Sequence, residues 1–243
     1  MVSIISDVGN KRTLNEDYAS YLETDEYKIY VVTDGMGGHN AGEVASKMAA
    51  EGIVDFIKEK FSIYTRKEEI LKDAILKVNM EILNFSELDE KLSGMGTTVT
   101  AVLKTSSDIF VGNVGDSSCL GIKDGKIVKI TKDHSLVQEL LDLGTISEEE
   151  AINHPKKNII TRAVGTSEEL LVDIFKINKN EFDMFLLCSD GLTNEVSKEE
   201  IVRIIYSSES TYKACNKLIE AAKNNGGRDN ITILLCGGDE IKW

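Results

Sequence analysis

The chain has 243 residues and a net charge of −13, with 41 acidic against 28 basic side chains. Such an acidic chain repels nucleic acid phosphates, and no dense stripe of lysine and arginine offsets this, so we expect no nucleic acid partner. No apolar run approaches the roughly 18 residues of a membrane span, and the first residues lack the basic start and apolar core of a signal peptide. We therefore expect a cytoplasmic protein with no membrane partner.

The apolar periodicity predicts a regular order of strands and helices. In the second predicted helix, for example, apolar residues recur at helical spacing from Leu71 to Ile82 and give it one buried face. In chain order we expect strands near 2–8, 18–23 and 27–33, helices near 42–60 and 67–85, strands near 96–104, 107–114, 117–123 and 126–131, helices near 135–143 and 147–152, strands near 170–177 and 183–189, helices near 197–206 and 211–224, and a last strand near 230–236.

This order favours an α+β fold of two antiparallel sheets. Asp124-Gly125 between two strands predicts a tight hairpin, and pairs of helices separate other strands, which argues against a doubly wound parallel sheet. Two sheets stacked face to face, each covered by two helices, accommodate the count. The single proline, Pro155, and the absence of a linker favour one domain over residues 1–243, and a monomer is the default expectation.

The four cysteines show no CxxC spacing, and two of them, Cys188 and Cys236, lie inside apolar runs. A structural zinc site would need grouped ligands. We therefore expect reduced thiols, as in a cytosolic protein.

Four aspartates stand where an apolar run meets a glycine-rich or polar turn: Asp34, Asp116, Asp190 and Asp229. If these runs are strands of one core, their ends can bring four carboxylates to one edge. Carboxylates gathered in this way repel unless a cation neutralises them, and Mg²⁺ or Mn²⁺ suit an all-oxygen site. The alternative is that each Asp-Gly is an ordinary turn after a strand.

Several motifs carry a resemblance to a known family. The segments Arg12 to Asp17 (RTLNED) and Thr33 to His39 (TDGMGGH) resemble the opening of the metal-dependent protein phosphatases, type 2C. Further similar strings follow in the family's order, from about residue 3 to residue 236: Gly96-Thr97-Thr98, Val114 to Ser117, Asp133-His134-Ser135, Thr161 to Gly165, Ser189 to Leu192 and Gly227 to Thr232.

The resemblance implies a β-sandwich flanked by pairs of helices, a four-layer αββα fold, and two tightly bound Mn²⁺ or Mg²⁺ ions. It implies that Asp34 bridges the two ions, that the carbonyl of Gly35 binds the second, and that Asp190 and Asp229 bind the first. Asp116, together with Asp190, would support a third, weaker ion.

The resemblance also assigns residues around the ions. Glu16 and Asp17 would hold metal-bound waters or orient the site, and Asn230 belongs to the same motif as Asp229. Arg12 would grip the substrate phosphate, for which its planar fork is suited. The alternative for Arg12 is a surface ion pair with Glu16 or Asp17.

One position departs from the family's animal members, which carry a histidine, assigned as general acid, where this chain has Met36. Methionine cannot donate a proton. His39 is the nearest replacement, although a solvated turn histidine is the simpler interpretation, and a metal-bound water could serve instead.

The predicted activity is hydrolysis of phosphoserine and phosphothreonine in proteins. Two ions about 3.5–4 Å apart would activate a bridging water for in-line attack, without a covalent phosphoenzyme. No loop suited to a nucleophilic cysteine, Gly-x-Ser-x-Gly elbow or P-loop competes with this prediction. The resemblance is closest to bacterial stand-alone enzymes that reverse eukaryotic-like Ser/Thr kinases, so a cognate kinase is an expected partner.

Three alternatives stay open at the level of sequence. The segment near 135–166, with Lys156 and Lys157, is either a flap that helps to select phosphopeptides or an ordinary helical connection. The same metals could serve a nuclease or a nucleotide phosphohydrolase, which the acidic charge disfavours. A catalytically inactive phosphoprotein-binding module would be free to lose its metal carboxylates, and here every expected position is acidic.

Overall fold

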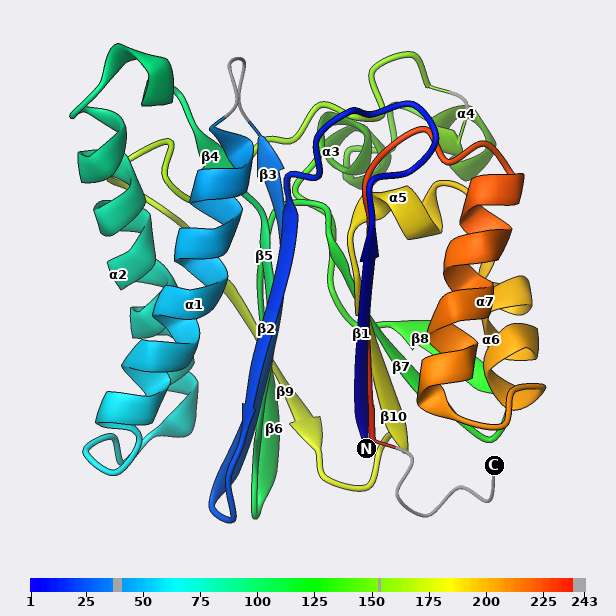
Figure 1. Ribbon diagram of the computed structural model, residues 1–243, viewed down its shortest axis with the longest axis horizontal. Coiled ribbons are helices and arrows are strands. Elements are labelled where there is room, and N and C mark those ends of the chain that lie inside the picture. The colour runs from blue at the N-terminus through cyan, green and yellow to red at the C-terminus, as the bar shows by residue number, and fades with distance from the viewer. Residues whose placement is uncertain (37–40, 153, 238–243) are drawn as a thin grey trace.

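The computed structural model describes residues 1–36, 41–152 and 154–237. Within them the chain forms two antiparallel sheets stacked face to face, with helices on both outer sides (Figure 1). The predicted four-layer αββα architecture is therefore confirmed. No helix of the described part is long and apolar enough to cross a membrane.

The first sheet contains both terminal strands. Its strands lie in the order β1 (Val2–Asp7), β11 (Ile231–Gly237), β10 (Met184–Cys188), β7 (Ser118–Lys123) and β8 (Lys126–Lys129). The second sheet has the order β2 (Asp17–Glu23), β3 (Tyr27–Met36), β5 (Val99–Thr105), β6 (Asp108–Val114) and β9 (Asp173–Asn178), with the short β4 (Gly96–Thr97) paired to the end of β3.

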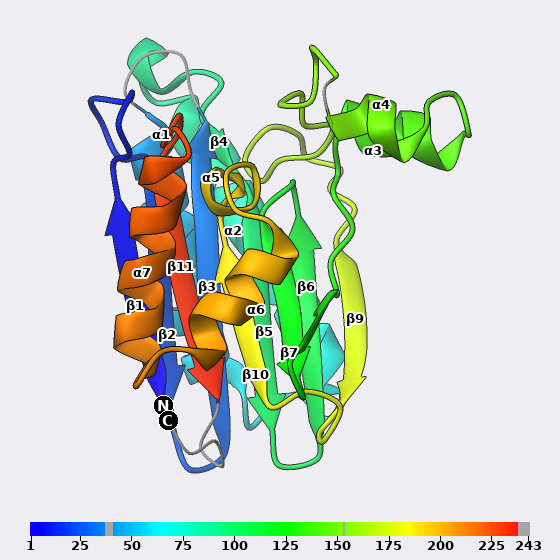
Figure 2. The ribbon, with the colours of Figure 1, turned by 90° about the vertical axis from the view of Figure 1, so that its right-hand side faces the viewer.

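Each sheet has its own pair of covering helices. The helices α1 (Gly42–Lys60) and α2 (Lys67–Ser86) pack on the second sheet, and α6 (Lys198–Tyr206) and α7 (Thr211–Asn224) pack on the first. The remaining helices are short. Two of them, α3 (Leu136–Asp142) and α4 (Glu148–Ile152), project to one side of the sandwich (Figure 2), while the 3-10 turn η1 (Glu90–Leu92) and α5 (Asp190–Thr193) lie in connections.

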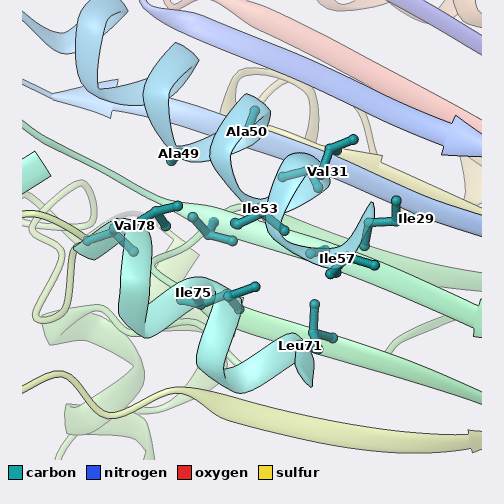
Figure 3. Packing of buried hydrophobic residues seen from close by; sticks show 14 of the residues in the cluster. Ile29, Val31, Ala49, Ala50, Ile53, Ile57, Leu71, Ile75 and Val78 are labelled. Atoms are coloured by element: carbon teal, nitrogen blue, oxygen red, sulfur yellow. The ribbon is translucent and has the colours of Figure 1, made fainter. Parts of the chain in front are cut away.

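Alternation along the strands produces three apolar layers. In β3, Ile29 and Val31 face α1 and α2, while Tyr30 and Val32 face the other sheet. Ile53 and Ile57 lie one helical turn apart on α1 and meet β3 on the same side (Figure 3). Because both faces of the central strands are buried, their sequences are continuously apolar.

Two local predictions need correction. The strand expected near 96–104 is broken at Thr98, where the hydroxyl and the N–H both hydrogen-bond to Asp34 instead of continuing a ladder. The helix α5 was not predicted, because four residues carry too little periodicity. The hairpin between β7 and β8 is confirmed, with Asp124 at φ 50° and Gly125 at φ 70°.

Candidate active site

The predicted aspartates share one cavity at the end of the sandwich. It has a volume of about 320 Å³ and lies at the upper end in Figure 1, where β3, α5 and the segment leading to β11 meet. Among the described residues, those that line it are Arg12, Glu16, Asp34, Gly35, Met36, Thr98, Asp116, Asn158, Ile160, Asp190, Asp229 and Asn230.

Strand and helix ends deliver these carboxylates from four places in the sequence. Asp34 lies near the end of β3, and Asp116 occupies the connection from β6 to β7. Asp190 begins α5 directly after β10, and Asp229 stands just before β11. The acidic edge therefore forms only when both sheets are in place.

The backbone of Asp34 is held on both sides. Its N–H donates to the Thr98 hydroxyl over 2.9 Å, and its carbonyl accepts from the Thr98 N–H and the Thr97 hydroxyl, also over 2.9 Å. The next residue must be glycine, because a Cβ on Gly35 would lie 2.1 Å from the carbonyl oxygen of Gly42. The strand end and the start of α1 thus touch through backbone alone.

The carboxylates on the cavity floor disfavour their own ionisation. Burial raises the pKa of Asp34 well above its ordinary value, and the charges of Asp17, Asp190 and Asp116 add to the effect. Burial together with Asp190 raises the pKa of Asp116 to about 7, and burial together with Asp229 raises the pKa of Asp190 to about 6. The cavity therefore favours a cation that would stabilise the charged forms.

Asp17 is the most deeply buried acid of the group, at 6% exposure, and it lies opposite Asp34 in the β2–β3 pair. Its Oδ2 accepts a hydrogen bond of 2.7 Å from the Ser189 hydroxyl, whereas its buried Oδ1 has no partner. Burial raises the pKa of Asp17 to about 7. A buried acceptor without a donor indicates room for a water or an ion.

Arg12 extends into the cavity and forms an ion pair with Asp229, with 2.8 Å between Nη2 and Oδ2. The pairing with Glu16 or Asp17 considered from the sequence is therefore replaced by one with a residue 217 positions away. About half of the Arg12 side chain, 49%, is exposed. The guanidinium is accessible to a ligand that enters from solvent.

Asn230 and Glu16 connect the first loop to the site. The Asn230 amide donates to the carbonyls of Val8 and Leu14 over 3.0 and 2.9 Å, and its oxygen accepts the Glu16 N–H over 2.9 Å. The pKa of Glu16 is raised by burial and by the nearby Glu43. Asn230 thus orders the segment that carries Arg12 and Glu16.

Sequence reasoning assigned no role to several residues that lie in or beside the cavity. Thr98 belongs to the Gly-Thr-Thr string, but its role depends on a contact with Asp34. Asn194 donates to Asp190 Oδ2 over 2.9 Å, and an Asp followed by Asn four residues later was the available signal. Asn158 and Ile160 come from the predicted flap. His39 lies outside the described residues and stays a prediction.

The residues fit divalent cations by their chemistry. Asp34, Asp116, Asp190, Asp229 and the Gly35 carbonyl offer oxygen donors alone, which hard ions prefer, and Asp17 adds an oxygen that lacks a partner. Among the described residues, no three His, Cys, Asp or Glu side chains already form a ligand set for one ion. Side chains at the cavity would therefore have to move when an ion binds.

A protein-family model described as Protein phosphatase 2C matches residues 9–225. The chain belongs to the protein phosphatase 2C family. It is therefore an enzyme, a protein phosphatase of the serine/threonine class, and phosphatases of this family depend on Mn²⁺ or Mg²⁺. The family resemblance predicted from the motifs is confirmed.

Similar proteins cover nearly the whole phosphatase chain. A serine/threonine phosphatase, stp, of Listeria monocytogenes is 42% identical over 237 residues, covering 96% of this chain and 94% of its own. Protein phosphatase PhpP of Streptococcus pneumoniae is 36% identical and covers 98% of both chains. The crystal structure of the Mycobacterium tuberculosis phosphatase PstP/Ppp superposes with a TM-score of 0.83 at 34% identity, covering 97% of both chains.

Proposed function

We propose that the chain hydrolyses phosphoserine and phosphothreonine in proteins at this cavity, with two Mn²⁺ or Mg²⁺ ions held by Asp34, the Gly35 carbonyl, Asp190 and Asp229. The observation that carries the proposal is that the carboxylates of Asp34, Asp116, Asp190 and Asp229 line one cavity, where burial and like charge oppose the ionisation of the first three. Bound there, the ions would supply Lewis acidity, which acidifies water and neutralises charge on phosphoryl oxygens.

Arg12 would bind and orient the phosphate. Its planar fork can donate to two phosphate oxygens, and half of it is accessible from solvent. The pair with Asp229 holds the guanidinium at the cavity in the absence of substrate. Arg12 would therefore move only a short way between its carboxylate partner and a phosphoryl group, and it would align phosphorus for in-line attack by water.

The acidic residues Asp17 and Glu16 would order solvent around the reacting group. Asp17 Oδ1 has no partner among the described residues and could accept a hydrogen bond from an ordered water, while the Ser189 hydroxyl donates to Oδ2 and holds the carboxylate in place. Glu16 lines the same cavity as Arg12. Asp116 with Asp190 would hold a third, weaker ion. Met36 lines the cavity and cannot donate a proton, so the leaving-group proton donor is His39 or water.

The substrate side of the proposal involves the segment 135–166, which we infer to be a flap of a single phosphatase domain over 1–243. Asn158 and Ile160 line the cavity, while α3 and α4 project from the sandwich (Figure 2). Lys156 and Lys157 adjoin these lining residues and would meet acidic or phosphate groups of a phosphoprotein. We place this phosphatase in the cytoplasm as a monomer, and a Ser/Thr kinase whose phosphorylation it reverses is the partner that this arrangement suits.

The test is release of phosphate from a Ser/Thr kinase that has phosphorylated itself, and from a phosphothreonine peptide. We expect release that requires Mn²⁺ or Mg²⁺, stops with a chelator and returns when the metal is restored. Nucleotides at the same concentrations should be poor substrates. Faster hydrolysis of nucleotides, or release unaffected by the chelator, would contradict the proposal.

A further inference from the structure

A buried histidine outside the cavity grips the peptide next to Asp116. His134 is 5% exposed, and its Nδ1 accepts the N–H of Gly115 over 3.1 Å. In return, the backbone N–H of His134 donates to the Gly115 carbonyl over 2.9 Å. Two hydrogen bonds therefore connect His134 to the residue that immediately precedes a cavity carboxylate.

The Gly115 backbone has a conformation that glycine adopts more easily than any other residue. Its φ of 102° lies in the region that favours glycine, and a Cβ there would approach Thr98 Cγ2 to 2.6 Å. The Asn113 amide also donates to the Gly115 carbonyl over 3.2 Å. The Gly115 backbone thus lies close to Thr98 on one side and is hydrogen-bonded to His134 on the other.

The far side of the imidazole is oriented by an ion pair. His134 Nε2 lies 3.2 Å from Asp173 Oδ2, and Arg162 Nη1 donates to Asp173 Oδ1 over 3.0 Å. Because Nδ1 accepts from Gly115, Nε2 must carry the proton and donate to Asp173. The approach of Arg162 Nη1 to Nε2 at 3.2 Å then brings two donors together and is not a hydrogen bond.

We propose that His134 is a positioning residue: by accepting the Gly115 N–H at Nδ1, it sets the direction of the Asp116 carboxylate into the cavity. The inference rests on the proposed function, in which Asp116 helps to hold the third, weaker ion. His134 also receives the N–H of Thr161 at its carbonyl, over 2.8 Å, at the base of the segment 135–166. The flap and the Asp116 loop thus share one anchor.

Two substitutions separate the two ring contacts. In His134→Asn the amide oxygen lies near the position of Nδ1 and can still accept from Gly115. In His134→Gln the amide lies near the position of Nε2, so it keeps the contact with Asp173 and loses the acceptor. If His134 only filled space, the two substitutions would have similar effects on the protein.

The first readout needs no metal. In protein kept in a chelator, we expect the Gly115 amide to exchange with solvent about tenfold faster in His134→Gln than in His134→Asn, the loss of one hydrogen bond. Nitrogen-15 shifts of the parent should show a neutral ring protonated at Nε2. Equal exchange rates, or a parent ring protonated at Nδ1, would overturn the proposal. The ring shifts decide the matter even if neither variant folds.

The second readout is Mn²⁺ binding by calorimetry. The weakest Mn²⁺ site should bind about tenfold less tightly in His134→Gln and about as in the parent in His134→Asn, with similar melting temperatures in chelator. Equal losses in both variants would contradict a positioning role. A parent chain that binds only two Mn²⁺ ions would instead contradict the proposed third ion, and the amide exchange would then decide the role of His134.

Discussion

The two ends of the sandwich differ in whether their charged side chains have partners of opposite charge. The end away from the candidate site holds a cavity of about 560 Å³ whose lining includes Arg66, Lys176 and Asp108. There Lys176 pairs with Asp108 over 2.8 Å and lowers the pKa of that carboxyl, and Arg66 pairs with Glu68. At the active-site end, burial and like charge raise the pKa values of the carboxylates instead.

The difference shows where a cation from outside is needed. Among the described lysines and arginines, none forms an ion pair with Asp34, Asp116 or Asp190, and Arg12 reaches only Asp229. Like charges held together in a protein destabilise it unless a ligand or a proton compensates. At one end the protein's own side chains pair with one another, while at the other the carboxylates of Asp34, Asp116 and Asp190 lack such partners among the described side chains, which supports the proposed metal site.

The largest effect should follow from Asp34→Asn. Loss of the proposed bridging carboxylate should lower kcat/KM on a phosphothreonine peptide by at least about 100-fold, because metal-ion stabilisation is worth several kcal/mol. Steady-state kinetics in saturating Mn²⁺ would measure this. Unchanged turnover would remove the proposed ions from the mechanism and revive a metal-independent role for this end.

The next effect concerns Arg12, which we propose binds the substrate phosphate. Arg12→Ala should lower kcat/KM by roughly 10- to 100-fold, the loss of hydrogen bonds between charged groups, with Arg12→Lys intermediate because it keeps the charge without the fork. The matched control is Lys176→Ala, which breaks an ion pair at the opposite end and should leave the kinetics unchanged. Similar losses in both variants would erase the distinction between the two ends.

A smaller effect should appear in stability without metal. The folded pKa of Asp17, about 7, lies above the ordinary 3.8, so its contribution to stability is present at low pH and is lost as pH rises to about 7. Asn does not titrate. In chelator, Asp17→Asn should therefore be more stable than the parent by roughly 2 kcal/mol at pH 8, with the difference shrinking toward pH 4. Urea unfolding across this range would show it, and a constant difference would contradict the assigned pKa.

The smallest effect should come from the flap. Replacing Lys156 and Lys157 with Ala should raise KM for acidic phosphopeptides about threefold, since exposed charges are screened by salt and contribute little. Hydrolysis of a small aryl phosphate serves as the internal control and should not change. Identical kinetics on both kinds of substrate would favour an ordinary helical connection.

Much of the architecture followed from local pattern. Continuous apolar runs such as Ile29 to Val32 indicated buried strands, and Asp124-Gly125 indicated a hairpin, because both signals depend on neighbouring residues. The positions of the aspartates at the ends of apolar runs predicted that they lie at one edge, and the family motifs added their individual roles. They did not reveal that Arg12 pairs with Asp229, or that Thr98 supports the Asp34 backbone.

These contacts could not be predicted because they join distant parts of the chain. His134 illustrates the limit: its motif was visible, but its partners Gly115 and Asp173 lie 19 and 39 positions away on other elements. Nothing in the composition of either segment indicates which ring nitrogen accepts a hydrogen bond and which carries the proton. Geometry of this kind emerges only when the sheets are packed together.

The pairing of β1 with β11 has a consequence for when the candidate site can assemble during synthesis of the chain. Val2 to Asp7 of β1 align with Ile231 to Cys236 of β11, and this pairing brings the loop with Arg12 beside Asp229. Arg12 and Asp229 are 217 positions apart, so a nascent chain contains the arginine long before it contains the carboxylate that pairs with it. The ion pair that holds the Arg12 guanidinium at the cavity can therefore form only late in synthesis, together with the pairing of β11 to β1.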